Sequence, residues 1–167
     1  ERIYFVGIRK DLVKKNKYFE WPEPIKTPKI QDYLIDSCEL ELDERKRSYK
    51  TFLKFLGNKY NKGLFQVKKI LKDEYLVLDT RQSDLRLYRD KVPTLRTGRH
   101  GILYIKNGKF RKLSGFESLL LQGFPKNLAE KTRGKIADVY LLSQAGNAMT
   151  VNVIEAIGKN LLNYINT

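Results

Sequence analysis

The dipeptide Asn107-Gly108 constrains the fold of this chain more than any other local feature, because it lies between two segments with the composition of β-strands. Gly101–Ile105 precedes it and Lys109–Arg111 follows it. Asn-Gly favours the tight turn in which both central residues take positive φ, and this turn matches the right-handed twist of paired strands. The spacing therefore predicts a β-hairpin with strands at 101–105 and 109–111.

Helical spacing follows the hairpin. Ser114 and Glu117 are separated as in a capping box, where each side chain accepts a hydrogen bond from the backbone N–H of the other residue. We predict a helix that Ser114 caps and that ends at Leu121. A shorter apolar segment covers 136–142. Apolar residues recur on one face of 148–165, and this pattern predicts a long amphipathic helix.

The N-terminal half of the chain mixes extended and helical patterns. Ile3–Ile8 alternates and then becomes apolar, with β-branched and aromatic residues, which predicts a buried strand. Residues 10–29 are rich in proline and lysine, and residues before proline avoid the helical region, so we expect an extended linker or arm. Further predicted elements are helices at 30–35 and 42–58, the second ending at Gly57, and strands at 64–67 and 75–78.

The charge balance is strongly basic. The 167 residues include 33 Lys and Arg against 19 Asp and Glu, a formal net charge of +14 at pH 7. A polyanion is therefore the first partner to consider, and DNA or RNA fits better than a membrane surface. General lysine-rich usage would produce the same excess and stays open as an alternative. No apolar run approaches the roughly 18 residues needed to span a bilayer.

Residues that carry chemistry are few. The single cysteine, Cys38, excludes an internal disulfide and a cysteine-based zinc site, and it fits a reducing cytosol. Its neighbours Asp36 and Glu39 disfavour a thiolate. His100 is the only histidine, and no nucleophile elbow, phosphate-binding loop, dinucleotide fingerprint or zinc-protease motif is present. We predict no metal site, and the sequence contains no complete catalytic apparatus.

Two blocks near the end of the chain carry a family resemblance. Residues 110–125 end in Gln-Gly-Phe-Pro, and residues 144–153 begin with Gln-Ala-Gly-Asn-Ala. Each is short and weak alone. Together with Thr94-Leu95 upstream and the opening block Glu1–Arg9, their order and spacing resemble the last motifs of the DNA cytosine-5 methyltransferases.

The resemblance implies roles for particular residues. Arg2 matches the second arginine of the family's arginine motif, which contacts the flipped cytosine, and a planar, always-charged guanidinium suits that task. Thr94 and Leu95 match the Thr-Leu pair of the target recognition domain, where the threonine contacts a phosphate beside the extruded base. Asn147 and Ala148 match the closing motif, which helps to hold S-adenosylmethionine; the family more often has serine at position 148.

The segment after Thr94-Leu95 extends the DNA-binding prediction. Arg96, Thr97, Gly98, Arg99 and His100 are candidates for contacting duplex DNA, and the arginines and histidine could read guanine edges in the major groove. A basic surface turn is the plain alternative. Nearby cations favour a surface that faces DNA: Arg81, Arg86, Arg89 and Lys91.

The physical argument for the cofactor concerns Gly146-Asn147. We predict a helix start there, whose free N–H groups would attract the cofactor's carboxylate. A departure from the family pattern occurs at Phe116, where the family usually has arginine before the glutamate, so a local salt bridge is in doubt. The family's nucleophilic cysteine lies in a Pro-Cys motif that this chain lacks, so we expect the chain alone to be inactive.

The expected fold is α+β. It comprises a small irregular β-rich recognition domain with helices, at residues 10–135, plus a strand at 1–9 and a closing motif and helix at 136–167. The resemblance implies that both ends belong to a Rossmann-like, S-adenosylmethionine-dependent catalytic domain N-terminal to this chain. Because the arginine motif is only half present, we expect the chain to be incomplete, with exposed apolar ends that could self-associate.

The resulting functional prediction is the C-terminal part of a bacterial DNA cytosine-5 methyltransferase, cytoplasmic and associated with the nucleoid, in a restriction-modification system. Its role would be to recognise a site in double-stranded DNA, support the flipped cytosine and complete the cofactor pocket. The resemblance leaves two alternatives open. One is a non-catalytic DNA-binding subunit of a split methyltransferase, and the other is a relative that methylates transfer RNA.

Overall fold

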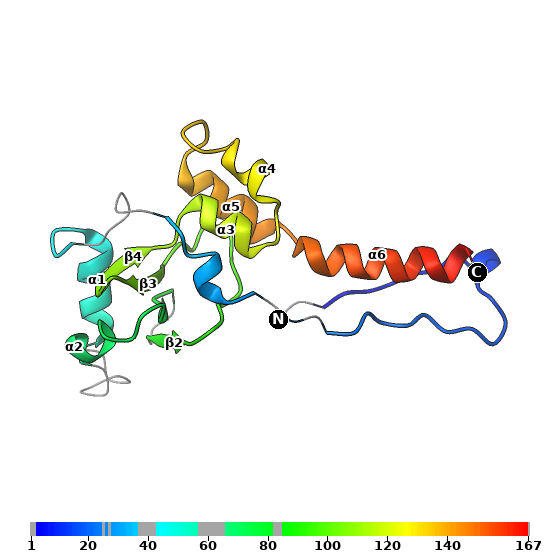
Figure 1. Ribbon diagram of the computed structural model, residues 1–167, viewed down its shortest axis with the longest axis horizontal. Helices are drawn as coiled ribbons and strands as arrows, with labels where there is room; N and C mark the ends of the chain where they lie inside the picture. The colour runs from blue at the N-terminus through cyan, green and yellow to red at the C-terminus, as the bar shows by residue number, and fades with distance from the viewer. Residues whose placement is uncertain are drawn as a thin grey trace.

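The computed structural model describes residues 3–24, 26, 28–36, 43–56, 66–81 and 85–166. It has a mixed α/β body and a projection made of the last helix and the N-terminal arm (Figure 1). In chain order the elements are η1 Lys10–Leu12, η2 Ile30–Asp32, α1 Arg47–Leu56, α2 Val67–Ile70, β1 Val77–Asp79, β2 Arg86–Tyr88, β3 Ile102–Lys106, β4 Lys109–Lys112, α3 Gly115–Leu121, α4 Lys126–Glu130, α5 Asp138–Asn147 and α6 Val151–Asn166.

A four-stranded antiparallel sheet in the order β2-β1-β3-β4 forms the centre of the body. The predicted hairpin is confirmed: β3 pairs with β4, with Lys106 opposite Lys109. Asn107 and Gly108 have φ of 55° and 66°, the two positive values that the Asn-Gly turn was expected to provide. The turn residues therefore determine the register of the two longest strands.

The other strands differ from the sequence prediction in part. The strand predicted at 75–78 is confirmed as β1, whose Val77 pairs with Tyr88 of β2 and with Tyr104 of β3. The strand predicted at 64–67 is wrong at Val67, which begins α2, while residues 64 and 65 lie outside the described ranges. The short strand β2 was not predicted, because three residues are too few to show an alternating pattern.

Helices cover both faces of the sheet, so strand residues are buried whichever face their side chains point to. On one face, Phe52 of α1 and Ile70 of α2 pack against Leu78, Leu103 and Phe110. On the other face, α3 and α5 pack over a second cluster of strand residues, which are Val77, Ile102 and Tyr104. This arrangement explains why β1 and β3 are apolar at nearly every position instead of alternating.

The predicted start of α3 is confirmed at atomic detail. The hydroxyl of Ser114 accepts a hydrogen bond from the Glu117 backbone N–H at 3.0 Å, and Glu117 accepts one from the Ser114 N–H at 3.0 Å. A Cβ on Gly115 would lie 2.6 Å from the Leu141 Cβ, so this glycine allows α3 and α5 to approach closely. Asp138 reinforces the contact by accepting a bond from the Gly115 N–H at 3.0 Å.

Two predicted helices are shorter than expected. The helix predicted at 42–58 is described as α1, Arg47–Leu56, with residues 42, 57 and 58 outside the described ranges. Phe52 is fully buried, whereas the next residue, Leu53, is 42% exposed. The helix predicted at 30–35 is only the single 3₁₀ turn η2, although Ile30 and Leu34 do enter the core.

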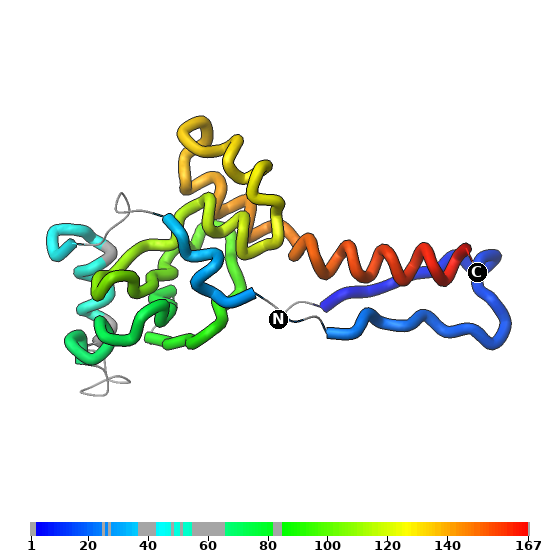
Figure 2. Tube along the Cα trace, viewed as in Figure 1, coloured from blue at the N-terminus to red at the C-terminus, as the bar shows by residue number. Residues whose placement is uncertain are grey.

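The strand predicted at Ile3–Ile8 is wrong: the described residues 3–9 are extended but join no sheet. Ile3 and Phe5 are 82% and 92% exposed, because a strand is buried only when a neighbouring strand and a covering layer are present. The arm runs out along α6, turns, and returns as the extended segment predicted for 10–29 (Figure 2).

The long helix predicted at 148–165 is confirmed as α6, which begins three residues later than predicted, at Val151.

Contacts between the arm and α6 fix the projection. The Tyr164 hydroxyl, from the last turn of α6, accepts a hydrogen bond from the Lys14 backbone N–H at 3.1 Å. Asn160 donates its side-chain amide to the Glu20 carbonyl at 2.9 Å. Across the described part of the chain, no helix is both long and apolar enough to cross a membrane.

Candidate nucleic-acid interface

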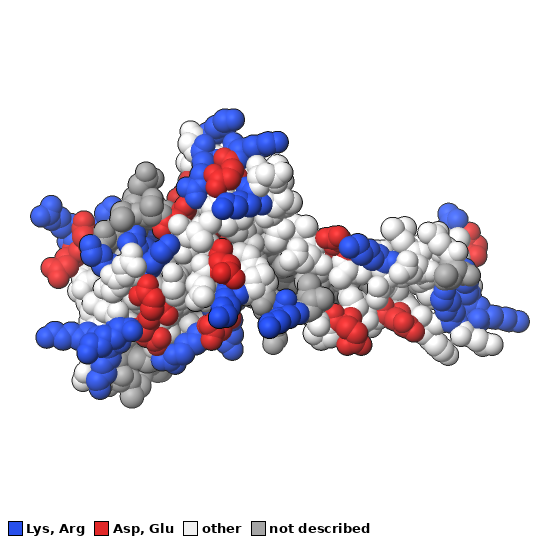
Figure 3. All heavy atoms as spheres, viewed as in Figure 1, with Lys and Arg blue, Asp and Glu red and all other residues white. Residues whose placement is uncertain are grey.

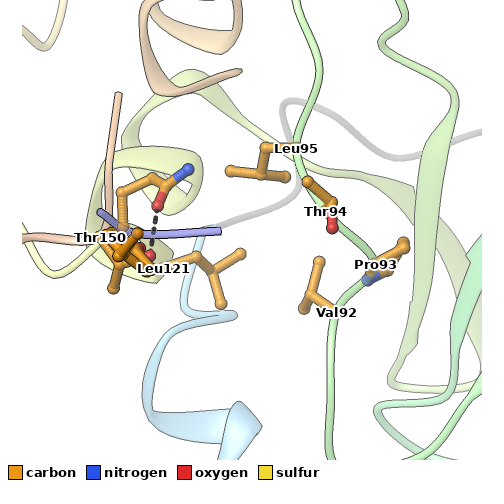
Figure 4. A pocket seen from close by; sticks show the side chains of 8 residues that line it. Val92, Pro93, Thr94, Leu95, Leu121 and Thr150 are labelled. Atoms are coloured by element: carbon orange, nitrogen blue, oxygen red, sulfur yellow. Dashed lines mark hydrogen bonds between the residues drawn. The ribbon is translucent and has the colours of Figure 1, made fainter. Parts of the chain in front are cut away.

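A cavity of about 300 Å³ brings together segments that are far apart in the sequence (Figure 4). One wall is the segment that contains Thr94-Leu95, and the opposite wall comes from the end of α3 and the start of α6. The arm reaches the cavity through Tyr4. The lining residues are Tyr4, Val92, Pro93, Thr94, Leu95, Leu121, Gln122 and Thr150. The opening block, the Thr-Leu pair and the Gln-Gly-Phe-Pro block therefore meet at one place.

Gln122 joins three helices beside this cavity. Its side-chain nitrogen donates to the Ala145 carbonyl of α5 at 2.7 Å, and its side-chain oxygen accepts from the Thr150 hydroxyl at 3.0 Å, the bond drawn in Figure 4. Its own carbonyl accepts the backbone N–H of Val151, the first residue of α6, at 2.8 Å. The sequence block that contains Gln122 thus connects α3 with α5 and α6 through hydrogen bonds.

We call residues 92–100 the recognition loop. Its start is fixed by a buried ion pair: Arg81 bonds both oxygens of Asp79, at 2.7 and 2.9 Å, and donates to the Thr94 carbonyl at 2.9 Å. Both charged side chains are 5% exposed. Burial alone would raise the pKa of Asp79, but the hydrogen bonds and charge of Arg81 outweigh it and hold the pKa below its usual value.

This ion pair corrects the expectation that Arg81 faces DNA. The guanidinium of Arg81 donates its hydrogen bonds to Asp79 and to the Thr94 carbonyl. It therefore supports the recognition loop from the interior of the protein. Arg89, also expected to face DNA, forms an ion pair with Asp73 at 2.7 Å but keeps its side chain 70% exposed. Arg86 and Lys91 are exposed as expected. Charge counts from sequence could not separate these cases, since burial depends on the fold.

The middle of the recognition loop rests on the end of α5. Thr97 Oγ1 lies 2.5 Å from Asn147 Oδ1 and 3.2 Å from the Ser143 carbonyl oxygen. A Cβ on Gly146 would lie 2.5 Å from the Arg96 carbonyl carbon and 2.5 Å from the Thr97 nitrogen, closer than real Cβ atoms come to backbone. Gly146 is therefore required for this approach.

The predicted helix start at Gly146-Asn147 is wrong. Both residues belong to the last turn of α5, and Ala148 follows as its C-cap, with its N–H bonded to the Gln144 carbonyl at 2.8 Å. The next helix begins only at Val151. Glycine and asparagine are common where helices end as well as where they begin, so the local pattern could not decide between the two.

The tip of the recognition loop is open to solvent. Arg96, Thr97, Gly98 and Arg99 are exposed, and Gly98 makes the turn with φ of 71°. Leu95 is 8% exposed and anchors the loop in the core. His100 is half-buried, with Nε2 3.5 Å from the Ser143 hydroxyl. Burial and then the charge of Lys112 lower the pKa of His100, which favours the neutral ring.

At Phe116, where the family usually has arginine, another arginine of this chain packs on the ring. The guanidinium carbon of Arg133 lies 3.8 Å from the centroid of the Phe116 ring, and the same group forms an ion pair with Asp36. Glu117 is fully buried and accepts hydrogen bonds from the Tyr104 hydroxyl at 2.8 Å and the Asp36 backbone N–H at 2.9 Å. Burial, the largest influence, raises the pKa of Glu117.

Several residues that contact α3 beneath this site were missed from the sequence. Tyr104, Asp36 and Arg133 come from separate segments, and no local spacing links them. The predicted cytosine contact, Arg2, lies outside the described residues, and so does Cys38, for which no role was predicted. Within the described ranges, no group of three His, Cys, Asp or Glu side chains could hold a metal ion. Lysine and arginine are spread over the body with acidic residues among them, so they form no single basic face in this view (Figure 3).

Comparison with known proteins places the chain in a family. A sequence model of the C-5 cytosine-specific DNA methylases matches residues 1–163. The chain belongs to the C-5 cytosine-specific DNA methylase family. Members of this family generally use S-adenosylmethionine as the methyl donor.

Three curated relatives agree with this membership. The chain is 26% identical to the Type II methyltransferase M.SsoII of Shigella sonnei, over 100% of the chain and 41% of the relative. It is 30% identical to the Type II methyltransferase M.DsaV of Dactylococcopsis salina, over 99% of the chain and 43% of the relative. It is 27% identical to the Type II methyltransferase M.Bsp6I of Bacillus sp. (strain RFL6), over 96% of the chain and 49% of the relative. The chain thus spans less than half of each relative. No solved structure matches it with significance.

Proposed function

We propose that this chain is the recognition domain and closing part of a longer DNA cytosine-5 methyltransferase of a Type II restriction-modification system, and that it selects the target site in double-stranded DNA. The observation that carries the proposal is the cavity between Thr94-Leu95 and the Gln122–Thr150 pair. It unites the family's separate sequence blocks in one site, as expected if they act on one extruded base.

The recognition loop supplies the DNA contacts in this proposal. Thr94 is half-buried at the cavity wall, where a hydroxyl can contact the phosphate next to the extruded cytosine. Arg96 projects from the exposed tip, where a guanidinium can bond both acceptors of a guanine edge. The loop is held from behind by Arg81 and Asn147, so its tip is presented on a rigid base.

The cytosine and cofactor contacts rest on the family resemblance. Arg2 would hold the flipped base; its neighbour in the arm, Tyr4, lines the cavity. The helix-start argument for the cofactor does not hold, because the Ala148 N–H is bonded within α5 and the Asn147 side-chain oxygen faces Thr97. The Asn147 amide nitrogen is the donor that would contact S-adenosylmethionine, which supplies the methyl group when bound. Ala148 would contribute backbone only.

We further propose that α6 and the strand-like segment 3–9 dock against the catalytic domain of the longer enzyme. Ile3 and Phe5 are exposed, as are Val153, Ile154 and Leu162 of α6. Helix α5 differs from α6 because it packs on α3 in the core of the body, so α5 is not part of the proposed docking surface. The isolated 167-residue chain should then self-associate through these apolar residues. Sedimentation of the chain against an Ile3→Ser, Phe5→Ser double variant tests this, and an unchanged monomer in both would contradict it.

The test of the function is a methylation assay on the full-length protein. Purified enzyme with labelled S-adenosylmethionine is offered duplex DNA of mixed sequence and, separately, transfer RNA. We expect 5-methylcytosine at one defined duplex site. Label in transfer RNA alone would support the RNA-methylating alternative. Label in DNA only after a second polypeptide is added would support the split-subunit alternative. Either result would overturn the proposal.

A further inference from the structure

A second cavity, of about 340 Å³, lies at the far end of the recognition loop from Thr94. Cationic side chains from three elements line it: Arg47 from α1, Arg99 from the loop and Lys112 from β4. His100 and Gly101 complete the wall beside the loop. We call this cavity the basic cleft. Of its lining residues, Arg99 and His100 were expected to read bases, and Arg81 fixes the start of the recognition loop.

The described residues that line the basic cleft carry more positive than negative charge. No Asp or Glu is among the described residues that line it, and Arg81, which also borders it, is neutralised by Asp79. Burial and then the charge of Lys112 lower the pKa of His100, so Lys112 lies close enough for its charge to act on the ring. Like charges gathered around one space repel, and a bound anion relieves that repulsion.

The walls of the cleft are fixed by the sheet. The Gly101 carbonyl accepts hydrogen bonds from the backbone N–H and the hydroxyl of Thr80, both at 2.8 Å. A Cβ on Gly101 would lie 2.6 Å from the Thr80 hydroxyl oxygen, so only glycine allows this approach. Leu103 lies two residues after Gly101, and Lys112 pairs with Leu103 on the neighbouring strand. Arg99, His100 and Lys112 are therefore tied to one rigid frame.

The chemistry of the lining suits a phosphate group. A guanidinium presents two parallel N–H donors that match two phosphate oxygens, and an ammonium adds a point charge. A neutral histidine can donate a further hydrogen bond from one ring nitrogen. Because Arg99 and His100 belong to the same loop as Thr94, the phosphate is best supplied by the backbone of the DNA that the loop binds.

Building on the proposed function, we propose that Arg99, His100 and Lys112 form a binding site for a backbone phosphate of the duplex, so that Arg99 anchors the recognition loop and does not read a base. Base reading by the loop then belongs to Arg96. The loop would be held on DNA at both ends, by Thr94 at one phosphate and by the basic cleft at another, with the exposed tip between them.

The test compares charge-removing variants in the full-length protein. Arg99→Gln and Lys112→Gln are made together with Lys109→Gln, a matched control that lies on the same strand but does not line the cleft. Binding is measured to a duplex with the preferred site and to one without it, from 50 to 200 mM salt. Lys112→Arg tests whether charge alone restores binding, and thermal melting confirms that each variant folds.

We expect Arg99→Gln and Lys112→Gln to weaken binding to both duplexes by the same factor and to leave the preferred site unchanged. Each lost phosphate contact reduces the magnitude of the slope of log K against log salt by about 0.9. Between 50 and 200 mM salt, the affinity of such a variant should therefore fall by a factor about 3.5 times smaller than that of the wild type. Lys109→Gln should keep the wild-type slope, and Lys112→Arg should restore it.

Three results would overturn the proposal. The first is a changed base preference in Arg99→Gln with an unchanged salt slope, which would make Arg99 a base reader. The second is a wild-type slope in Lys112→Gln. The third is displacement of DNA by inorganic phosphate beyond the effect of chloride at equal ionic strength, with unchanged slopes in the variants, which would indicate a free-anion site. Absence of any duplex binding by the wild-type enzyme would instead refute the proposed function.

Discussion

Asn147 Oδ1 lies 2.5 Å from Thr97 Oγ1, so the closing motif of the chain holds the tip of the recognition loop. The two residues belong to segments that the sequence assigned to different ligands, the cofactor and the DNA. Gly146 makes the contact possible by letting the loop backbone approach α5. We therefore propose that Asn147 positions the recognition loop for DNA binding, in addition to the cofactor contact proposed for it.

The first prediction concerns this bond. Asn147→Ala should weaken binding to the preferred duplex by about 0.5–1.5 kcal/mol, because the Thr97 hydroxyl loses the closer of its two acceptors and the loop tip loosens. Asn147→Asp keeps an oxygen at the same place and should retain most of the affinity. A double-mutant cycle with Thr97→Val checks the pairing by binding titration. Fully additive losses would show that the two residues act independently.

The second prediction concerns space at Gly146. Gly146→Ala should destabilise the fold by about 1–3 kcal/mol, because its Cβ would meet the backbone of Arg96 and Thr97 at 2.5 Å and the loop would have to move. Gly158→Ala in α6 is the matched control, since nothing lies within 4 Å of its Cβ. That change should be neutral or stabilise by up to about 1 kcal/mol. Chemical unfolding measures both, and equal effects would refute the close approach.

The third prediction concerns Gln122, which connects α3 with α5 and α6. Gln122→Ala should cost about 1–3 kcal/mol of stability, because the Ala145 carbonyl and the Thr150 hydroxyl lose their partner next to the cavity. Gln144→Ala, which removes an exposed glutamine side chain from α5, should change stability by less than about 0.5 kcal/mol. Thermal melting of the two variants separates the outcomes. Equal melting temperatures would mean that Gln122 does not join the helices.

The fourth prediction concerns pH. Burial raises the pKa of Glu117 above its ordinary value of 4.5, so the folded state binds this proton more tightly than the unfolded chain does. The resulting stabilisation is complete below pH 4.5 and is lost as pH rises through the folded pKa. Glu117→Gln does not titrate, so the stability of the wild type relative to this variant should fall as pH rises above 4.5.

Urea unfolding at a series of pH values measures this difference. Charged groups remote from Glu117 contribute equally in both proteins and cancel. A relative stability that rises with pH would show that the three donors around Glu117, from Ser114, Asp36 and Tyr104, favour the carboxylate more strongly than burial disfavours it.

The fifth prediction concerns the isolated chain. The 167 residues contain one cysteine, Cys38, and its Asp-Ser-Cys-Glu context does not match the family's nucleophile motif. The purified chain should therefore transfer no methyl group to cytosine in duplex DNA. Scintillation counting after incubation with labelled S-adenosylmethionine tests this. Label incorporated by the chain, and lost in Cys38→Ala, would show that the nucleophile lies here after all.

Local rules were sufficient for the parts of the fold that adjacent residues determine. Asn107-Gly108 specified a turn, its positive φ values and the register of two strands, because turn geometry depends only on the residues inside it. Ser114 and Glu117 specified the start of α3 for the same reason. The sequence blocks also determined family membership, since a motif match needs only order and spacing.

Tertiary structure alone decided the remaining features, because each depends on a segment remote in the chain. Ile3–Ile8 has the composition of a strand but meets no neighbouring strand among the described residues. Arg81 has the charge of a DNA contact, but Asp79 and the Thr94 carbonyl draw it into the interior. Gly146-Asn147 could begin or end a helix, and its close contact with the recognition loop became visible only when both were folded, since proximity in space is not encoded in local spacing.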